Sequence, residues 1–154
     1  MKSTGKYTLR ELKESEMPGI FPLIKQLNPT LSKPLFIKRL KAMTALDYHV
    51  VAAFDGKKMV ALSGFWIGMR FWCGREFDID NFIVDEKYRG TGIGKLLMVW
   101  LEDRARKEGT ELIVLDSYAS AYDAHAFYHA RGYGITGYHF TKAPASGKPF
   151  RKTS

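Results

Sequence analysis

The stretch Val84-Asp-Glu-Lys-Tyr-Arg-Gly-Thr-Gly-Ile-Gly94-Lys95 decides how this chain is interpreted. It sets one arginine, Arg89, and three alternating glycines between an apolar segment and an amphipathic one. Glycines let backbone N–H groups approach a ligand because no Cβ stands in the way, and the first turn of a helix adds unpaired donors and a positive dipole. The stretch therefore predicts a cradle for a phosphate or pyrophosphate group at the start of a helix.

The segments on either side support this placement. Upstream, residues 76–84 alternate apolar and acidic side chains as far as Asp80 and end in an apolar run, which predicts a strand with a bulge or a change from a half-exposed to a buried setting. Downstream, one apolar helical face runs between Gly92 and Gly109, and a short aliphatic strand follows at 111–115. The order strand, helix, strand predicts a crossover connection.

The rest of the chain predicts further elements of both kinds. They are a strand at 8–12, a helix running towards Asn28, a helix at 33–46, a hairpin of strands 48–54 and 59–69, a turn at 70–75, a helix opened by a capping box at Ser120 to Asp123 and ended by Gly132, and a final strand at 133–141. The expected fold class is α/β (mixed α+β), with helices packed on one sheet.

The spacing of the glycines separates this loop from other phosphate loops. It matches neither Gly-x-x-x-x-Gly-Lys-Ser/Thr nor Gly-x-Gly-x-x-Gly. The run Arg89-Gly-Thr-Gly92-Ile-Gly94 instead resembles the Arg/Gln-x-x-Gly-x-Gly/Ala element of the GNAT N-acetyltransferases. The later run Ala124-His-Ala-Phe-Tyr128-His-Ala-Arg-Gly-Tyr133 resembles that family's Ala-x-x-Phe-Tyr-x-x-x-Gly-Phe ending, so the resemblance covers residues 76–135.

The resemblance implies a GNAT-like acyl-CoA N-acyltransferase fold with a central, mostly antiparallel mixed sheet flanked by helices. Residues 1–154 would form one domain, with a variable acceptor half at 1–75 and an acetyl-CoA-binding half at 76–141. It also implies acetyl-CoA as co-substrate, its pantetheine arm paired with the backbone of Ile83 and Val84. The pyrophosphate would be held by the backbone amides of Arg89, Gly90, Thr91, Gly92, Ile93, Gly94 and Lys95.

Two catalytic residues follow from the same resemblance. Tyr128 occupies the place of the family's tyrosine, which donates a proton to the departing thiolate, and Asp80 stands where many relatives carry the base. Asp78 should project on the same strand face as Asp80 and bind a cationic substrate. The alternatives are a core aromatic role for Tyr128 and a solvated or salt-bridged face for the two aspartates. Ala121 departs from the family, which often carries asparagine there.

The function expected on these grounds is direct transfer of an acetyl group to a primary amine of a small cationic metabolite, drug or peptide. A non-catalytic acyl-CoA-binding or regulatory module is the alternative, raised by Ala121. No metal is expected, because His125 and His129 lack the glutamate of a His-Glu-x-x-His site.

Composition bounds the partners. The net charge of +8 attracts polyanions, but no nucleic-acid module is recognisable, and no apolar run approaches the roughly 20 residues that span a bilayer. With a single cysteine, Cys73, the chain has no internal disulfide, so we expect a soluble cytoplasmic protein without nucleic-acid or membrane partners. The aromatic residues before and within the cofactor strand leave two alternatives open, an acceptor groove or a core with a homodimer edge; they are Phe65, Trp66, Phe71, Trp72 and Phe77.

Overall fold

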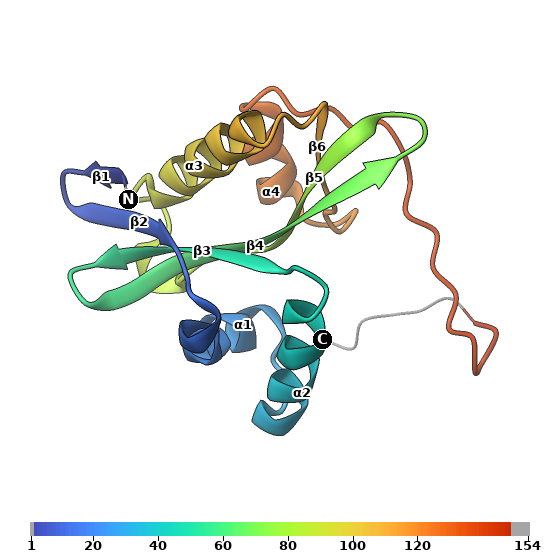
Figure 1. Cartoon of the computed structure of the whole chain (residues 1–154), viewed down its shortest axis with the longest axis horizontal. Coiled ribbons are helices and arrows are strands. Elements are labelled where there is room, and N and C mark those ends of the chain that lie inside the picture. Colours follow the sequence, from blue (N-terminus) through green and yellow to red (C-terminus); the bar gives the residue numbers. More distant parts are fainter. Residues whose placement is uncertain (1, 149–154) are drawn as a thin grey trace. The chain divides into compact units, whose positions relative to one another are not determined.

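The computed structural model describes residues 2–148, which fall into two compact units divided between Val114 and Leu115. The first unit contains most of the secondary structure, and the second contains one helix, α4 (Tyr122–His129). Figure 1 shows the elements along the chain.

The first unit is built on a sheet with the strand order β1-β2-β3-β4-β5-β6. The strands are β1 (Lys2–Thr4), β2 (Tyr7–Glu11), β3 (His49–Asp55), β4 (Lys58–Arg70), β5 (Gly74–Val84) and β6 (Leu112–Leu115). Each pair from β1 to β5 is antiparallel. Strand β6 follows β5 through a helix, a connection typical of parallel neighbours. The sheet is therefore mixed and mostly antiparallel, which confirms the expected fold class.

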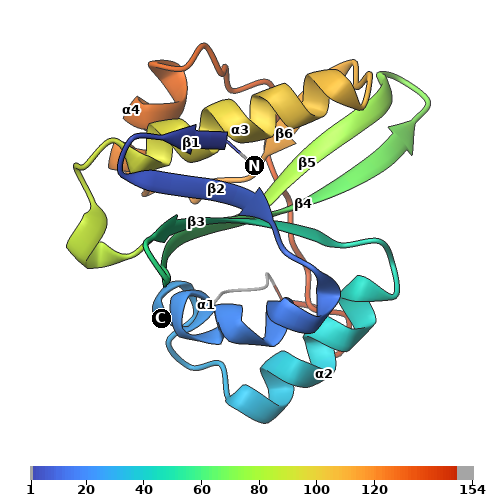
Figure 2. The ribbon, with the colours of Figure 1, turned by 60° about the vertical axis from the view of Figure 1, so that its left-hand side comes forward.

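Helices cover both faces of this sheet. They are the 3₁₀ helix η1 (Glu14–Ile20), α1 (Phe21–Leu27), α2 (Lys33–Thr44), the 3₁₀ turn η2 (Glu86–Tyr88) and α3 (Ile93–Lys107). Helices α1 and α2 lie on one side of the sheet and α3 lies on the other, as Figures 1 and 2 both show. The helices η1, α1, α2 and α3 each bury apolar residues, whereas η2 has no buried residue.

Alternate residues of the central strands supply the two cores. On the α3 side, Phe65 and Phe77 are fully buried with ring centroids 4.7 Å apart. On the side of α1 and α2, Leu62 and Ile83 join a cluster that also takes in Tyr48. Burial of such side chains stabilises the fold by about 1.5–3 kcal/mol each.

A bulge near the end of β5 explains the break in period seen in the sequence. Leu62 pairs with Ile83 and Gly64 pairs with Asp80, so Ser63 stands opposite two residues, Asn81 and Phe82. Asn81 has a positive φ of 52°. One extra residue reverses the alternation of side chains, which is how Ile83 comes to share a core with Leu62.

The second unit departs from two sequence predictions. The predicted capping box is wrong: α4 begins after Ala121, which has no side-chain oxygen, and no side-chain cap bond forms. The predicted strand at 133–141 is also wrong, because no described residue of that segment belongs to a strand ladder. Gly134 and Gly137 supply no side chain to pack, and Ile135 is exposed.

The five aromatic residues for which the sequence left two roles open lie in different environments. Phe65 and Phe77 are core residues, and Trp66 packs against the core on the side of α1 and α2. Phe71 and Trp72 are exposed at the turn between β4 and β5, which is shorter than predicted. For Phe71 and Trp72, both an acceptor groove and a homodimer edge stay predictions.

Candidate active site

The glycine loop lies between the end of β5 and the start of α3. The Asp85 N–H donates to the Val60 carbonyl (2.9 Å), and an Asp85 carboxylate oxygen accepts from the Lys87 N–H (3.0 Å), which starts the turn η2. Gly90 (φ 76°) and Gly92 (φ 84°) then take left-handed conformations, with Gly92 as the N-cap of α3. Such conformations are costly for residues with a Cβ.

This geometry directs backbone donors to one place. The first N–H groups of a helix, here from Ile93, Gly94 and Lys95, have no acceptor within the helix. A Cβ placed on Gly90 or Gly92 would meet no protein atom within 4 Å, so space beside the loop is open. Arg89 and Lys95 are exposed and add positive charge. The arrangement can hold a pyrophosphate.

The end of β5 presents backbone groups on its other edge. Ile83 and Val84 pair with β4 on one side. On the other side the neighbour is β6, whose approach is marked by the bond from the Glu111 N–H to the Arg75 carbonyl (2.8 Å). Four residues of strand span about 13 Å, whereas Arg75 to Val84 spans about 30 Å. Strand β6 therefore ends before it reaches Ile83 and Val84.

Asp80 lies at the bulge within a polar cluster on the face covered by α1 and α2. The Asn81 side-chain amide donates to the Asp80 carboxylate (2.5 Å) and to the Tyr48 hydroxyl (3.2 Å). Burial raises the pKa of Asp80. The polar groups of Tyr48, Trp66 and Asn81 act on the pKa of this carboxylate in the opposite direction and lower it. Asp78, which pairs with Trp66, projects from the same face of β5.

Two members of this cluster, Tyr48 and Gly64, were not predicted from the sequence. A Cβ on Gly64 would lie 1.7 Å from the Tyr48 hydroxyl, so the glycine makes room for the phenol. A glycine inside the apolar run 59–69 was the available signal, because it often marks close approach by another group. Tyr48 carried no motif that could have identified it.

Tyr128 lies on α4 in the second unit. Its ring packs against Phe127 (centroids 5.5 Å apart) and Tyr133 (6.1 Å). Burial raises the pKa of its phenol, so the hydroxyl keeps its proton at neutral pH. All other predicted site residues belong to the first unit, where Asp78 and Asp80 share a strand face and the glycine loop follows the same strand.

The family profile decides between the possible interpretations of this loop. The acetyltransferase (GNAT) family matches residues 8–133, a span that includes the loop, Asp80 and Tyr128. The chain belongs to the GNAT family. It is therefore an acyltransferase, and the resemblance seen in the sequence is confirmed.

Individual relatives support the same assignment. Over 131 residues the chain is 28% identical to the uncharacterized N-acetyltransferase YhdJ of Bacillus subtilis, covering 84% of this chain and 92% of the relative. Over 72 residues it is 39% identical to an aminoalkylphosphonate N-acetyltransferase of Salmonella typhimurium, covering 47% and 45%. The fold matches an aminoglycoside N-acetyltransferase solved in complex with CoA, with a TM-score of 0.78, 14% identity and coverage of 93% and 98%.

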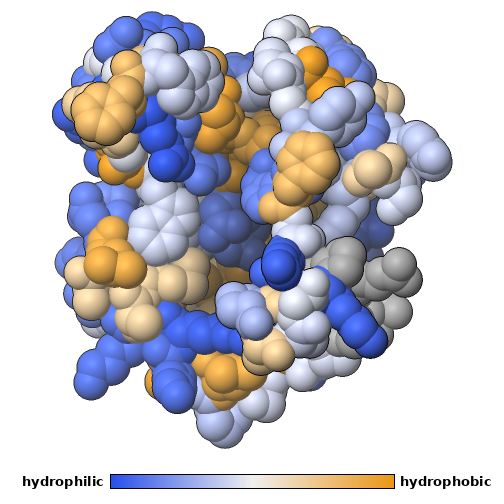
Figure 3. Space-filling view, turned by 90° about the vertical axis from the view of Figure 1, so that its right-hand side faces the viewer, coloured by the Kyte–Doolittle hydropathy of each residue, from blue (hydrophilic) through white to orange (hydrophobic). Residues whose placement is uncertain are grey.

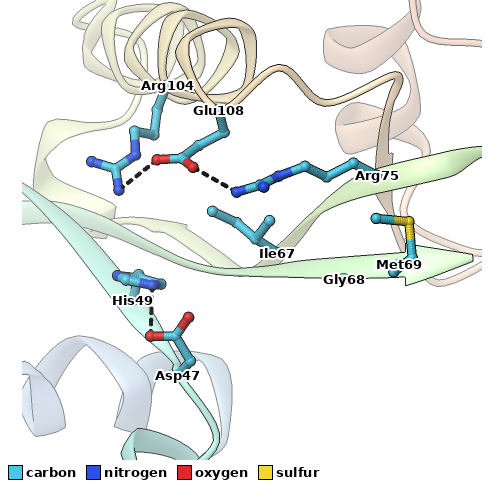
Figure 4. Close-up of a pocket in the computed structure, with 8 residues that line it drawn as sticks. All are labelled: Asp47, His49, Ile67, Gly68, Met69, Arg75, Arg104 and Glu108. Carbon is cyan, nitrogen blue, oxygen red and sulfur yellow. Dashed lines mark hydrogen bonds and ion pairs between the residues drawn. The ribbon is translucent and has the colours of Figure 1, made fainter.

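The first unit of this GNAT protein has a hollow whose lining includes no residue of the glycine loop. It has a volume of about 480 Å³, and Figure 4 shows its lining, with the Glu108 carboxylate between Arg75 and Arg104. The Glu108 oxygens lie 2.8 Å from the Arg75 guanidinium and 3.0 Å from that of Arg104. His49 lies 3.2 Å from Asp47 in the same hollow. Glu108 thus balances part of the arginine charge, whereas the Nε atoms of Arg75 and Arg104 are buried without a hydrogen-bond partner among the described residues.

Two negative findings concern the described residues. Within residues 2–148, no three His, Cys, Asp or Glu side chains converge as they would around a metal ion. His125 and His129 instead lie 2.9 Å and 3.0 Å from backbone carbonyl oxygens. No helix in this part of the chain is long and apolar enough to cross a membrane. On the face drawn in Figure 3, hydrophilic and hydrophobic residues are interspersed.

Proposed function

We propose that this GNAT protein forms one N-acetyltransferase domain over residues 1–154 and transfers an acetyl group from acetyl-CoA directly to a primary amine of a small cationic metabolite, drug or peptide. The observation that carries the proposal is the left-handed Gly90 and Gly92 pair at the N-terminus of α3, directly after the strand that holds Asp80. The family match supports a single domain because residues 8–133 extend into both units.

The residues present fit acetyl-CoA. Open space beside Gly90 and Gly92 and the amides of residues 92–95 suit the pyrophosphate, while Arg89 and Lys95 suit its charge. The predicted amides of Arg89 and Thr91 instead donate to the Glu86 and Tyr88 carbonyls (3.4 Å each). The backbone of Ile83 and Val84, beyond the end of β6, suits the amides of a pantetheine arm. When bound, acetyl-CoA supplies a thioester carbonyl that an amine can attack.

Two side chains of this chain would move the protons. Asp80 accepts a proton from the substrate ammonium, and its raised pKa brings it closer to the working pH of a general base. The Tyr128 phenol donates its proton to the thiolate that leaves, and burial keeps that proton in place beforehand. Asp78 adds negative charge on the same strand face, which favours a cationic amine over an anionic one.

Direct transfer needs no nucleophile from the protein. The only cysteine, Cys73, lies at the turn between β4 and β5. Desolvation and the nearby Glu76 raise the pKa of its thiol, which lowers the fraction of reactive thiolate. Cys73 is therefore a poor candidate for a covalent acetyl intermediate.

The test combines binding with turnover. Acetyl-CoA is titrated by calorimetry, and thiol release is then followed over a panel of polyamines, aminoglycosides, peptides and aminoalkylphosphonates. We expect binding, with release for a cationic class. Release only for aminoalkylphosphonates would contradict the cationic acceptor but not the reaction. Binding without release for any amine would favour the non-catalytic module, for which the bare N-cap of α4 at Ala121 is the structural argument.

A further inference from the structure

Tyr48 immediately precedes β3 and begins the strand predicted at 48–54, but it belongs to none of the motifs that the sequence singled out. Its side chain is buried, with 5% of its surface exposed, among apolar residues on the side of α1 and α2. Its ring lies 4.7 Å from that of Trp66, between centroids. Packing of this kind would be served equally by phenylalanine, so the hydroxyl needs its own explanation.

The Tyr48 hydroxyl meets the polar groups of the bulge. It accepts a hydrogen bond from the Asn81 amide (3.2 Å), and the same amide nitrogen donates to the Asp80 carboxylate (2.5 Å), so one donor joins the phenol and the carboxylate. Asn81 makes both contacts from a backbone with a positive φ. A phenol that accepts from the amide can donate its own proton only to another acceptor, and the Asp80 carboxylate, bound to the same amide, is the charged acceptor of this cluster.

The backbone around the bulge is adapted to this contact. Gly64 faces Asp80 across the ladder, and any side chain there would occupy the position of the Tyr48 hydroxyl. The Ser63 hydroxyl donates to the Asp80 carbonyl (3.2 Å) and so ties down the backbone that carries the carboxylate. Glycine inside a strand and a left-handed asparagine both weaken local structure, and here both serve the same polar contact.

We propose that Tyr48 is a positioning residue for Asp80, donating its hydroxyl proton to one side of the carboxylate so that the other side faces the acceptor amine. This inference rests on the proposed function, in which Asp80 is the base. Burial and the charge of Asp80 raise the pKa of Tyr48, which keeps the phenol a donor throughout the working pH range. Removing the donor leaves the carboxylate partly buried with one fewer partner, which favours its protonated form.

Few other groups can disturb this titration. Trp66 and Asn81, whose polar groups also act on the pKa of the carboxylate, do not titrate. Asp78 shares the strand face. Helix α1, which packs against β5, contributes Lys25 as its only titratable residue, and that ammonium donates to the Leu31 carbonyl (3.0 Å).

The experiment compares Tyr48→Phe with Tyr7→Phe, a buried tyrosine on β2 away from the bulge. The Asp80 carboxylate is titrated by carbon NMR in the protein alone, and kcat/KM is measured against pH with the acceptor found by thiol release. Loss of one hydrogen bond to a carboxylate predicts a rise of about one pKa unit, or roughly tenfold lower kcat/KM on the acidic limb. The Tyr7→Phe variant should match the parent, and the KM for acetyl-CoA should be unchanged in both.

An unchanged Asp80 titration in Tyr48→Phe would overturn the proposal, whatever the activity. Gly64→Ala gives a second test with the phenol retained, because its Cβ should displace the hydroxyl and raise the same pKa. Full activity of Asp80→Asn would instead show that Asp80 is not the base, which contradicts the proposed function. The NMR titration of Tyr48→Phe tests the Tyr48–Asp80 contact separately, because it does not depend on activity. Thermal melting establishes that each variant is folded before it is compared.

Discussion

Two glycines at opposite ends of α3 allow the role of the loop to be separated from its contribution to folding. Gly92 (φ 84°) precedes the helix, and Gly109 (φ 65°) follows its C-cap, Glu108. An added Cβ meets no protein atom within 4 Å at either position. Gly92→Ala and Gly109→Ala therefore introduce the same kind of backbone strain, and only Gly92 belongs to the proposed pyrophosphate cradle.

The two substitutions should destabilise the protein by similar amounts but change its affinity for acetyl-CoA by different amounts. A residue with a Cβ in the left-handed region costs about 1–2 kcal/mol, so each variant should unfold roughly 2–8 °C below the parent. Relaxation of the loop towards negative φ would turn the amides after residue 92 away from the ligand. We expect the Kd for acetyl-CoA to rise at least tenfold in Gly92→Ala, about 1.4 kcal/mol, and to stay within about twofold in Gly109→Ala.

Calorimetric titration with acetyl-CoA, at a temperature well below both melting points, measures the difference. Thermal unfolding followed by circular dichroism checks that the two variants lose similar stability. Equal affinity in both variants, with the expected loss of stability at Gly92, would refute the assignment of this loop to the cofactor. A gain of CoA affinity in Gly109→Ala would show that the control is not neutral.

The remaining predictions concern titratable groups. Tyr128→Phe should lower kcat about tenfold to a hundredfold and leave the Kd for acetyl-CoA unchanged, because the hydroxyl acts only as the thiolate leaves. An unchanged kcat in the thiol-release assay would show that Tyr128 is not the general acid. Asp80→Asn should depress kcat/KM most at low pH, where more of the amine is protonated, and a uniform loss of amine affinity across pH would make it a binding charge instead. The Arg10 guanidinium, 2.6 Å from Glu16, lowers the pKa of that carboxyl to about 2. The ion pair of Arg10 with Glu16 therefore stabilises the protein above the unfolded pKa of the carboxyl, and this stabilisation is lost as pH falls towards 2. Glu16→Gln should make the free energy of unfolding, measured by urea titration, less dependent on pH in the acid range. An unchanged pH dependence would contradict this ion pair.

Local patterns predicted most of the first unit correctly. The face of α3 repeats at helical spacing, and the loop before it combines glycine with a helix start, so both can be recognised from neighbours in sequence. The bulge also showed itself as a break in alternation near Asp80. The short strand β1 was not predicted, and the turn between β4 and β5 is tighter than expected.

The second unit shows where local patterns mislead. Residues 133–141 contain enough aromatic and branched side chains to predict a strand, but a strand also needs a partner ladder, and none of the described residues there has one. Ser120 and Asp123 have the spacing of a capping box, but α4 begins one residue too late for Ser120 to cap it. Both errors concern which hydrogen-bonding groups come together in the folded chain, and the spacing of residues along the sequence does not determine this.

The sequence by itself determined the family, the glycine loop before α3 and the strand that carries Asp80, because each depends on residues close together in the chain. Only the tertiary structure decided what surrounds that carboxylate. Tyr48, Gly64 and Asn81 come from three separate segments, and sheet register with a one-residue bulge brings them to one point. Register is set by the packing of whole strand faces, so no local pattern could have joined these three residues.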